Sequence, residues 1–553
     1  MAAKLKVAPV QAIRKLVQRQ GRYTVPLGGL NYRESLLTMQ PSEALVLDNF
    51  IPRAFGIEIR KGWRYWAPKA NKFPNEVRSI LVFTDAKPIG SKIFAGTADP
   101  GGLLYDVTTQ GVAPTLALTP STAPFNPGEW YATNYTTPGG SFFCAVSQGA
   151  GYYLYDSTAG WREVPVGAAV GQIKFPAGDT TTPKDFAFCW LWKNRLWFLK
   201  GGSATAYYLP IGQITGEVAA LELGPQLIHG GSLLFATSWT YDSGRGIDDG
   251  LVFASTEGDI LVYQGSDPTA LATFSLQGLW YTGRFPGRRC FNAVGGDVVM
   301  VTEFGVIKIS DLVSGKVQTS AVNGEDAFYK INPRLARYVS DTIGQNYWFV
   351  LPFPTEELVV FGAPYIEPVK GVRTSFILNY ATSAWASLSN ADLLCGEVYR
   401  GQIIFGTRDG YVCQLFYGYN DQVSADGTDV GIEVTGRLQT AFNNFDDPRI
   451  NKRLLRIKLY GLSDGVPTLG VKFVDEYNMS TVTNAPAPIA INEYTWDVGL
   501  WDDAKWQSTQ IPFRRWFGVA GFGKKLAMIM AIRGRGYTLL SDYEALYESG
   551  YNL

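Results

Sequence analysis

Histidine is almost absent from this chain of 553 residues, in which His229 is the only one. Imidazole is the commonest metal ligand and the usual general base, so a single histidine cannot build a histidine-based metal site. The sequence also lacks a Gly-x-Ser-x-Gly nucleophile turn, and it has no phosphate-binding loop or dinucleotide fingerprint in a strand–turn–helix context. We therefore expect no enzyme, no catalytic residue, no metal and no cofactor, and we interpret His229 as a loop or core histidine.

Paired cysteines are lacking as well. The chain has five cysteines, an odd number, and no two of them form a Cys-x-x-Cys motif. Most lie inside apolar runs that resemble strands, which favours buried free thiols in a reducing compartment over a disulfide framework or a zinc site. The five are Cys144, Cys189, Cys290, Cys395 and Cys413.

Long apolar stretches are also missing. No run of about 18 apolar residues occurs, so we expect no membrane span. The first residues contain no apolar core of a secretory signal. The sequence therefore predicts a protein that is made in a cytosol and stays soluble or assembles there.

An excess of charge of either sign is absent, because 49 basic residues balance 49 acidic ones. A free nucleic-acid-binding protein usually carries a basic excess, since contacts with phosphates supply most of its affinity. The balanced charge argues against tight DNA binding as the function. It is compatible with a wall along which DNA slides, where strong binding would be a disadvantage.

Aromatic residues, glycine and proline are abundant instead. Aromatic residues make up 14% of the chain, which also contains 60 Gly and 30 Pro, whereas charged residues reach only 18%. This composition favours strands and turns over helices. The length exceeds what one core usually supports, so we predict an all-β protein of several domains.

A repeated pattern covers residues 75–425. In each unit an apolar run is followed by a Gly-containing turn and by a second run that carries an aromatic residue. The equivalent aromatic residues recur at intervals of about 50 residues, at Tyr105, Tyr155, Tyr208 and Tyr263. Two hairpin-like strands per repeat of this length predict a β-propeller, whose small sheets must stack because none buries both faces alone.

The rest of the chain differs from this repeat. A Pro-rich stretch near 352–373 interrupts one unit, and we interpret it as a long loop or a small extra module. Residues 430–553 alternate apolar and polar side chains and predict a β-sandwich-like domain. Residues 23–74 form an opening segment that we expect to pack on the platform formed by the folded domains. The predicted fold is a β-propeller with an additional β-sandwich-like domain and an extended N-terminal arm, residues 1–22.

The N-terminal arm is basic, with no acidic residue before Glu34. Two interpretations remain open, a flexible solvated arm or an arm that docks on a neighbouring subunit or faces DNA. If the arm docks, Arg14, Lys15 and Arg19 are the candidate assembly contacts.

Few other residues suggest chemistry. Propeller glycosidases need paired carboxylates in the central well, which Asp248 with Asp249, or Glu257 with Asp259, could supply. The sequence has no aspartate box of the sialidase type. Tryptophans in the range 190–197 could stack on sugars, but packing between propeller sheets explains them better.

Three stretches resemble a known family. The first covers 26–62 and contains PLGGLN, ALVLDNFIPR and GIEIRKG. The second combines QTAF at 439–442 with KRL at 452–454, and the third is YEALYE at 543–548. Together they are similar to the tail nozzle, or tail hub, proteins of short-tailed bacteriophages, which are also described as packaged-DNA stabilisation proteins.

The resemblance implies a structural role in a virion tail that is assembled in the host cytoplasm. Such proteins form a sixfold ring beneath the portal and its adaptor ring, extend the DNA channel, retain the packaged genome and conduct it during ejection. Tail fibres or spikes attach around the ring. The implied partners are therefore copies of this chain, the adaptor ring, fibres or spikes, and double-stranded DNA that passes without sequence-specific binding.

Two physical expectations accompany the resemblance. A ring of identical chains uses head-to-tail interfaces that close by rotation. A strongly basic lining would bind the DNA and stall it, so we expect a neutral to acidic channel surface.

Two alternatives remain. A carbohydrate-binding or carbohydrate-cleaving propeller could act in host-receptor recognition, and carboxylates that converge in the propeller well would favour it. A cell-surface adhesion module is disfavoured by the missing signal peptide and the odd number of cysteines.

Overall fold

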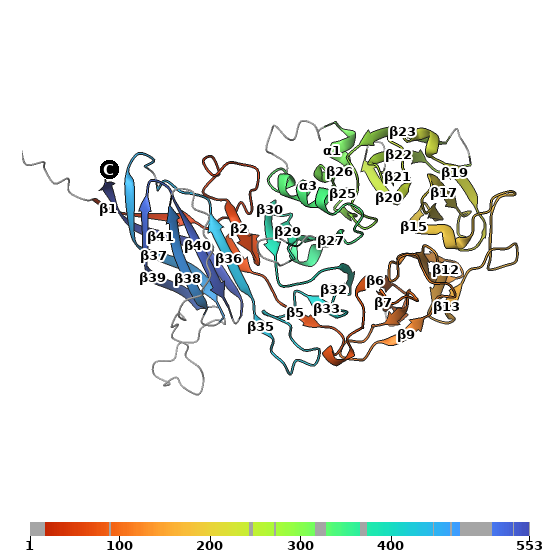
Figure 1. The fold of residues 1–553 in the computed structure, drawn as a ribbon, viewed down its shortest axis with the longest axis horizontal. Helices are drawn as coiled ribbons and strands as arrows, with labels where there is room; N and C mark the ends of the chain where they lie inside the picture. The colour runs from red at the N-terminus through yellow and green to blue at the C-terminus, as the bar shows by residue number, and fades with distance from the viewer. Residues whose placement is uncertain are drawn as a thin grey trace, which may run out of the picture.

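The computed structural model describes residues 17–87, 90–242, 247–269, 273–315, 328–364, 366, 373–445, 447–464, 467–475, 511–534 and 536–551. Figure 1 shows two parts: a β-propeller at the right, and at the left a pair of sheets built from both ends of the chain. The predicted fold class, an all-β protein with a propeller and an additional β domain, is confirmed.

The propeller sheets follow one another along the chain. The first is β6 (Val77–Phe83), β7 (Lys92–Thr97), β8 (Leu104–Asp106) and β9 (Thr115–Leu118). The second is β10 (Tyr131–Thr137), β11 (Gly140–Ser147), β12 (Gly151–Asp156) and β13 (Gly160–Glu163). The third is β15 (Phe186–Trp192), β16 (Arg195–Lys200), β17 (Thr205–Tyr208) and β19 (Ala219–Glu222). The next is β20 (Leu233–Asp242), β21 (Ile247–Ser255), β22 (Asp259–Gly265) and β23 (Phe274–Tyr281).

Three further sheets complete the ring. One has the strands β24 (Phe291–Val294), β25 (Asp297–Thr302) and β26 (Gly305–Lys308), with the helices α1 (Ile309–Val313) and α3 (Asn332–Asp341) beside it. Another contains β27 (Phe349–Phe353), β28 (Leu358–Gly362), β29 (Ser375–Asn379) and β30 (Ala384–Leu388). The last contains β31 (Cys395–Tyr399), β32 (Gln402–Gly406) and β33 (Val412–Leu415).

The propeller is closed by a strand from the N-terminal side. Strand β5 (Trp63–Tyr65) pairs with β33 in the last sheet, with Tyr65 opposite Cys413 and Trp63 opposite Leu415. The inner strand β31 of the same sheet lies beside β6, the inner strand of the first sheet. Hydrogen bonds between chain segments about 350 residues apart in sequence therefore hold the ring closed.

Aromatic side chains explain how the sheets stack. Strand β12 is buried on both faces. On one face Tyr152 packs against Phe198 of the next sheet, with ring centroids 4.9 Å apart. On the other face Tyr155 packs against Phe94 of the preceding sheet at 5.0 Å. Because both faces are covered, these strands are nearly continuous apolar runs, as in other buried sheets.

The second part is a β-sandwich of two sheets that share one core. One sheet contains β3 (Phe50–Arg53), β4 (Gly56–Ile59), β41 (Thr538–Tyr551), β37 (Asn451–Ser463) and β39 (Ile511–Gly523), and β1 (Val17–Thr24) also pairs with β41. The other contains β2 (Ala44–Asp48), β36 (Thr435–Thr440), β40 (Leu526–Arg533) and β38 (Thr468–Asp475). Side chains from both sheets meet in the core, among them Ile457, Phe473, Met530 and Leu540.

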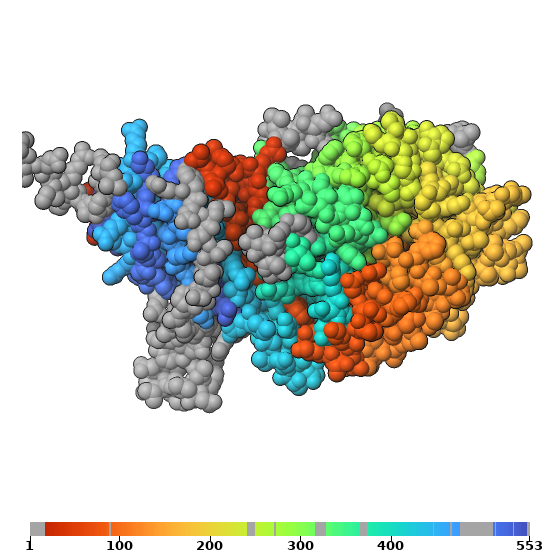
Figure 2. All heavy atoms as spheres, in the orientation of Figure 1, coloured from red at the N-terminus to blue at the C-terminus, as the bar shows by residue number. Residues whose placement is uncertain are grey.

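The propeller and the sandwich are joined by shared strand pairing and by the chain itself. Strand β2 pairs with β36 of the sandwich and makes a parallel bridge with β30 of the propeller, so one sheet of eight strands runs through both parts. In Figure 2 the N-terminal atoms, drawn in red, lie between the blue sandwich and the green part of the propeller. The chain crosses between the parts in both directions, from β4 to β5 and from β33 to β36.

Short elements complete the described structure. Two small ladders join β14 (Ile173–Lys174) to β18 (Gly216–Glu217) and β34 (Asn420–Asp421) to β35 (Ile432–Glu433). The 3-10 turns are η1 (Lys69–Asn71), η3 (Pro183–Asp185), η4 (Gly224–Gln226) and η6 (Pro354–Glu356). No helix in the described part of the chain is long and apolar enough to cross a membrane.

Three segments differ in detail from the sequence-based expectation. Residues 23–74 do not form a separate unit, because β2 to β4 belong to the sandwich sheets whereas β5 belongs to the propeller. Strand β28 lies inside the Pro-rich stretch near 352–373, so that part of the stretch is a propeller strand rather than an insertion. Within the basic arm, residues 17–22 lie in β1, which is hydrogen-bonded along its length to β41.

Candidate functional site

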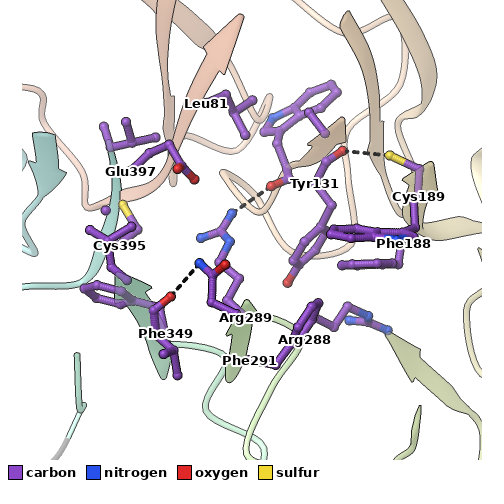
Figure 3. A pocket seen from close by; sticks show the side chains of 18 residues that line it. Leu81, Tyr131, Phe188, Cys189, Arg288, Arg289, Phe291, Phe349, Cys395 and Glu397 are labelled. Atoms are coloured by element: carbon purple, nitrogen blue, oxygen red, sulfur yellow. Dashed lines mark hydrogen bonds between the residues drawn. The ribbon is translucent and has the colours of Figure 1, made fainter. Parts of the chain in front are cut away.

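A cavity lies at the propeller axis, where the inner strands come together (Figure 3). Its volume is about 250 Å³. Most of the residues that line it are aromatic or aliphatic. Arg288, Arg289, Asn292 and Glu397 are the polar side chains among the lining residues whose charge or amide could bind a ligand. The axis of this propeller is therefore a small chamber whose wall carries both aromatic and charged groups.

Arg289 ties several sheets together beside this axial cavity. Its Nη1 donates to the carbonyl oxygen of Arg78 at 2.5 Å, and its Nη2 donates to Ser79 Oγ at 2.6 Å and to the carbonyl oxygen of Trp130 at 2.7 Å. All three acceptors are neutral, so the positive charge of Arg289 is held in place without being neutralised by them. Asn292 donates to the carbonyl oxygen of Val350 at 2.9 Å.

Glu397 supplies the carboxylate of the axial cavity. The residue lies in β31, and the backbone N–H of Val398 donates to its Oε1 at 3.2 Å. Burial raises the pKa of Glu397 above its ordinary value, while the Val398 N–H and the charge of Arg289 act in the opposite direction. Figure 3 shows the Glu397 carboxylate and the Arg289 guanidinium turned toward the same space.

Asp249, Glu257 and Asp259, three of the carboxylates suggested by the sequence, are not among the described residues that line this cavity. Asp259 is fully buried and accepts hydrogen bonds from the backbone N–H of His229 at 2.7 Å, with His229 Nδ1 2.6 Å from its other oxygen. Asp249 accepts a hydrogen bond from Thr240 Oγ1 at 2.9 Å on β21, and Glu257 lies in an exposed turn. The side chain of Asp248 lies outside the described residues.

The only histidine has a structural partner. His229 lies in the loop between η4 and β20, its side chain is about half exposed, and its ring stacks on Tyr281 at 4.1 Å. Its contact with Asp259 fixes the loop. Within the described part of the chain, no group of three or more His, Cys, Asp or Glu side chains could hold a metal ion.

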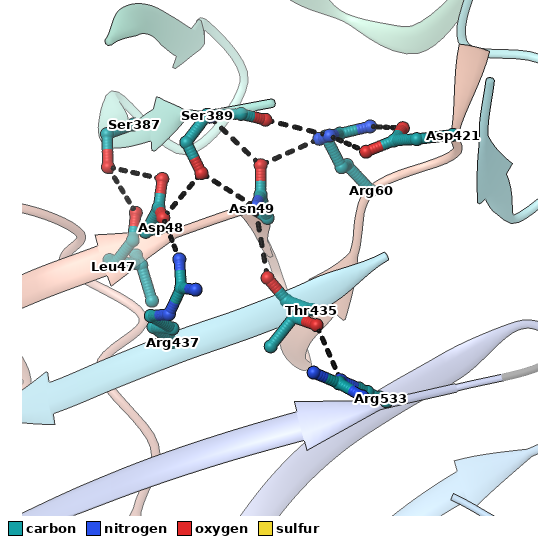
Figure 4. A network of polar contacts seen from close by, with 10 residues as sticks. All are labelled: Leu47, Asp48, Asn49, Arg60, Ser387, Ser389, Asp421, Thr435, Arg437 and Arg533. Carbon is teal, nitrogen blue, oxygen red and sulfur yellow. Dashed lines mark hydrogen bonds and ion pairs between the residues drawn. The ribbon is translucent and has the colours of Figure 1, made fainter. Parts of the chain in front are cut away.

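A buried polar network lies where the sandwich meets the propeller (Figure 4). We call it the joint cluster and define it as Asp48, Asn49, Arg60, Ser389 and Asp421. Arg60 is completely buried. Its guanidinium donates to both carboxylate oxygens of Asp421 at 2.8 Å, to Asn49 Oδ1 at 2.8 Å, and to the carbonyl oxygens of Lys61 at 3.0 Å and Ser389 at 2.9 Å. All five N–H groups of the guanidinium therefore have acceptors.

Asn49 extends the joint cluster to a third segment. It has a positive φ of 59°, a conformation that Asn tolerates better than most residues. Its side-chain amide donates to Ser389 Oγ and to the carbonyl oxygen of Thr435, at 3.0 Å each. Ser389 Oγ in turn donates to Asp48 Oδ2 at 2.7 Å. The joint cluster thus fixes β2, β30 and β36 to one another.

Charged residues form a second contact across the same boundary. Arg53 lies between two carboxylates, 2.9 Å from Glu58 and 2.9 Å from Glu356, and Lys61 lies 2.5 Å from Glu356. Burial alone would raise the pKa of Glu356, but the hydrogen bonds and charges of Lys61 and Arg53 hold that pKa below its ordinary value. Glu356 belongs to the propeller, whereas Arg53 and Glu58 belong to the sandwich.

The assembly contacts suggested by the sequence are only partly described. Arg14 and Lys15 lie outside the described residues. Arg19 lies in β1, paired in register with Tyr547 of β41, and its side chain is exposed. Arg22, further along the same strand, forms an ion pair with Asp542 at 2.7 Å. Side chains on both faces of the first half of β1 are exposed, although the strand belongs to a sheet.

The five cysteines are buried free thiols, as the sequence predicts. Burial raises the pKa of Cys144 to about 12 and that of Cys395 to about 11. Cys189 Sγ contacts the carbonyl oxygen of Cys144 at 3.4 Å. Cys189 and Cys395 line the axial cavity as small apolar side chains.

Sequence reasoning missed Arg60, Arg289 and Glu397. A local signal exists for Arg60, since it is a charged residue at the end of the strand-like run GIEIRKG. Glu397 and Arg289 give a weaker signal, because each is a charge next to an apolar run, in CGEVY and GRRCF. Only the closed ring brings them to one cavity.

Comparison with known proteins does not assign this chain to a family. No protein-family model matches the chain, and no curated protein matches its sequence. Among solved structures, the computationally designed Ika8 protein covers 64% of this chain and 100% of its own, with 11% identity and a TM-score of 0.36. YCF48 from Cyanidioschyzon merolae covers 64% of this chain and 98% of its own, with 9% identity and a TM-score of 0.36. Such distant similarity carries no statement about function.

Proposed function

We propose that this chain is a structural subunit of a bacteriophage tail ring, of the nozzle or hub type. In this proposal copies of the chain form a ring, of six by the resemblance, that extends the DNA channel below the portal and adaptor. The ring retains the packaged genome and conducts it during ejection. Its partners are the adaptor ring, tail fibres or spikes, and double-stranded DNA that passes without sequence-specific binding.

The observation that carries the proposal is the position of the stretch that resembles the nozzle family. Residues 26–62 contain β2, β3 and β4, and they supply Asp48, Asn49 and Arg60 to the joint cluster. The resemblance therefore falls on residues that fix the sandwich to the propeller, and not on a group with catalytic chemistry. A subunit that resists the pressure of packaged DNA needs such a fixed angle between its parts.

Close packing along the same stretch supports this role. Gly62 approaches the backbone of Asn420 so closely that an added Cβ would lie 1.9 Å from the carbonyl oxygen. Gly29 has a φ of 72° and lies against the backbone of Trp385. Both positions accept only glycine without rearrangement, because a side chain would collide with backbone atoms.

The balance of charge is consistent with a conduit. The chain has 49 basic and 49 acidic residues, so the ring would have no net charge with which to hold DNA. An electrostatic map of the assembled ring is the direct check of the neutral to acidic channel that we expect. A continuous basic lining would contradict it.

The experiment that tests the proposal is the mass of the purified chain in solution, alone and with candidate adaptor rings. A chain of 60.8 kDa that assembles into a ring of about six copies on an adaptor would support it. A chain that stays monomeric with every adaptor and binds or cleaves a glycan would contradict it.

The axial cavity favours one alternative, a carbohydrate-binding propeller in host-receptor recognition. Aromatic walls can stack on sugar rings. Cleavage would need two carboxylates flanking the bond, and Glu397 is the one carboxylate among the described lining residues. Binding to glycan arrays, without turnover, is the measurement that separates this alternative from the ring.

A further inference from the structure

The axial cavity contains two opposite charges that do not form an ion pair with each other. The hydrogen bonds of Arg289 with described residues use three of the five N–H groups of a guanidinium. The Nε–H and one Nη1–H remain for another acceptor. The three acceptors hold the guanidinium in one orientation, so this positive charge is fixed beside the chamber before anything binds.

Glu397 is the complementary group. Among described residues its carboxylate accepts one hydrogen bond, from the Val398 N–H at 3.2 Å. Such a bond is long for a carboxylate, which usually accepts several shorter ones when it is charged and removed from water. A partly buried carboxylate with so little support is unfavourable unless a ligand or water supplies further donors.

Aromatic side chains also line the cavity that holds these charges. Tyr131, Phe188, Phe291 and Phe349 come from four different inner strands and line the same cavity. Phe188 and Phe291 pack against each other with centroids 6.3 Å apart. The chamber therefore offers a hydrocarbon or aromatic surface with a cationic group and an anionic group beside it.

We propose that the axial cavity binds a compact zwitterion, a small molecule with one ammonium and one carboxylate group, such as an α-amino acid. The ammonium is placed at Glu397, the carboxylate at the remaining N–H groups of Arg289, and the hydrocarbon part lies against the aromatic walls. This inference is independent of the ring, since it concerns the interior of one subunit.

The charges of the lining favour a zwitterion over simpler ligands. A ligand with only a positive charge would be attracted by Glu397 but repelled by Arg288 and Arg289. A ligand with only a negative charge would be attracted by Arg288 and Arg289, but it would be repelled by Glu397 and would leave that carboxylate without a counter-charge. A neutral polyol would leave both charges without a counter-charge. At about 250 Å³ the cavity is below the usual range of about 300–1,000 Å³ for drug-sized ligands, so the zwitterion must be small.

The first experiment measures binding of the protein amino acids and glycine betaine to the full chain. Trp130 and Trp190 line the cavity, so tryptophan fluorescence reports its occupation, and calorimetry gives the affinity. The strongest binder is then compared with the amine that lacks its carboxylate and with the acid that lacks its ammonium. Each analogue should bind at least about tenfold more weakly, because each loses one buried charge pair.

A variant separates this site from binding elsewhere. Glu397→Gln keeps the size of the side chain and removes its charge, so it should weaken the zwitterion at least about tenfold. The same variant should bind the acid analogue better than the unmodified chain does, because the repelling carboxylate is gone. The matched control is Glu217→Gln in strand β18, where the exposed side chain pairs with Lys174, and it should change neither affinity.

Three results would overturn the proposal. One is a panel in which no zwitterion binds at millimolar concentration. Another is an equal affinity of the best zwitterion for the unmodified chain and for folded Glu397→Gln. The third is binding of neutral monosaccharides in preference to every zwitterion, which would instead support a sugar site. None of these outcomes depends on whether the chain forms a ring.

Discussion

Arg60 and Asp421 are 361 positions apart in the chain, yet the guanidinium of one donates to both carboxylate oxygens of the other at 2.8 Å. Arg60 follows the last sandwich strand of the N-terminal segment, and Asp421 follows the last strand of the propeller. Both side chains are buried. This ion pair therefore joins the place where the chain enters the propeller to the place where it leaves.

Asp421→Asn should strongly destabilise the protein. The substitution removes the negative charge and leaves the buried guanidinium of Arg60 without a counter-charge, which costs about 3–5 kcal/mol when one partner of a buried ion pair is lost. The free energy of unfolding from chemical denaturation, followed by tryptophan fluorescence, measures the effect. Asp409→Asn makes the same change in an exposed turn and should stay within about 0.5 kcal/mol. Equal stability of the two variants would show that the joint cluster is not essential for folding.

The propeller could be predicted from the sequence because each sheet is built from neighbouring strands. The two strands of a hairpin such as β11 and β12 are consecutive in the chain. Their turns and aromatic residues therefore recur in the sequence at a regular interval. The sandwich could not be predicted in the same way. Its strand β41 pairs with β1, β4 and β37, which come from both ends of the chain, and no local pattern indicates such partners.

The same reasoning explains what was missed at the sites. The polar character of Arg60 is visible in the sequence, but its partner depends on closure of the whole ring. Arg289 and Glu397 come from sheets that meet only at the axis. Arg14 and Lys15 lie outside the described residues, and Arg19 as an assembly contact stays a prediction.

Glu356, at the boundary between propeller and sandwich, should make the stability of the folded protein depend on pH. Lys61 and Arg53 hold the pKa of Glu356 below its ordinary value in the folded protein, so folding favours the charged form. The contribution is present above the ordinary pKa of a glutamate, about 4.3. It is lost as the pH falls through the lower pKa of the folded state.

The difference in unfolding free energy between the unmodified chain and Glu356→Gln measures this contribution. It should be largest near neutral pH, by up to about 1 kcal/mol because the cluster is partly exposed, and should shrink as the pH falls below 4. Glu217→Gln, at an exposed pair, provides the control. A difference that grows toward acid pH would contradict the assigned direction of the pKa shift.

The five thiols should be inert in the folded protein. All five are buried, and burial raises the pKa of Cys144 to about 12, so almost no thiolate is present near neutral pH. A thiol reagent such as dithionitrobenzoate should react with none of them in the native state and with all five in denaturant. Rapid reaction of one thiol in the native protein would show that its sheet opens locally.

Arg19→Glu should weaken assembly without affecting the fold. Arg19 lies on β1, an edge strand of the sandwich. The first half of β1 is exposed on both faces. An exposed edge strand is a natural place for a neighbouring chain to bind. Reversing the charge there should shift the equilibrium from ring to monomer, because a reversed charge disturbs the electrostatic complementarity of an interface. Light scattering of the chain mixed with its adaptor measures the ring fraction.

The control for this prediction is Lys87→Glu, which makes the same change of charge in an exposed propeller loop. Thermal unfolding of both variants should match that of the unmodified chain, so that a loss of ring cannot be attributed to unfolding. Removing residues 1–16 while keeping β1 then separates the strand from the preceding arm. If Arg19→Glu and the truncated chain both form rings as readily as Lys87→Glu, the neighbouring subunit binds elsewhere, and the basic arm is the solvated segment of the other interpretation.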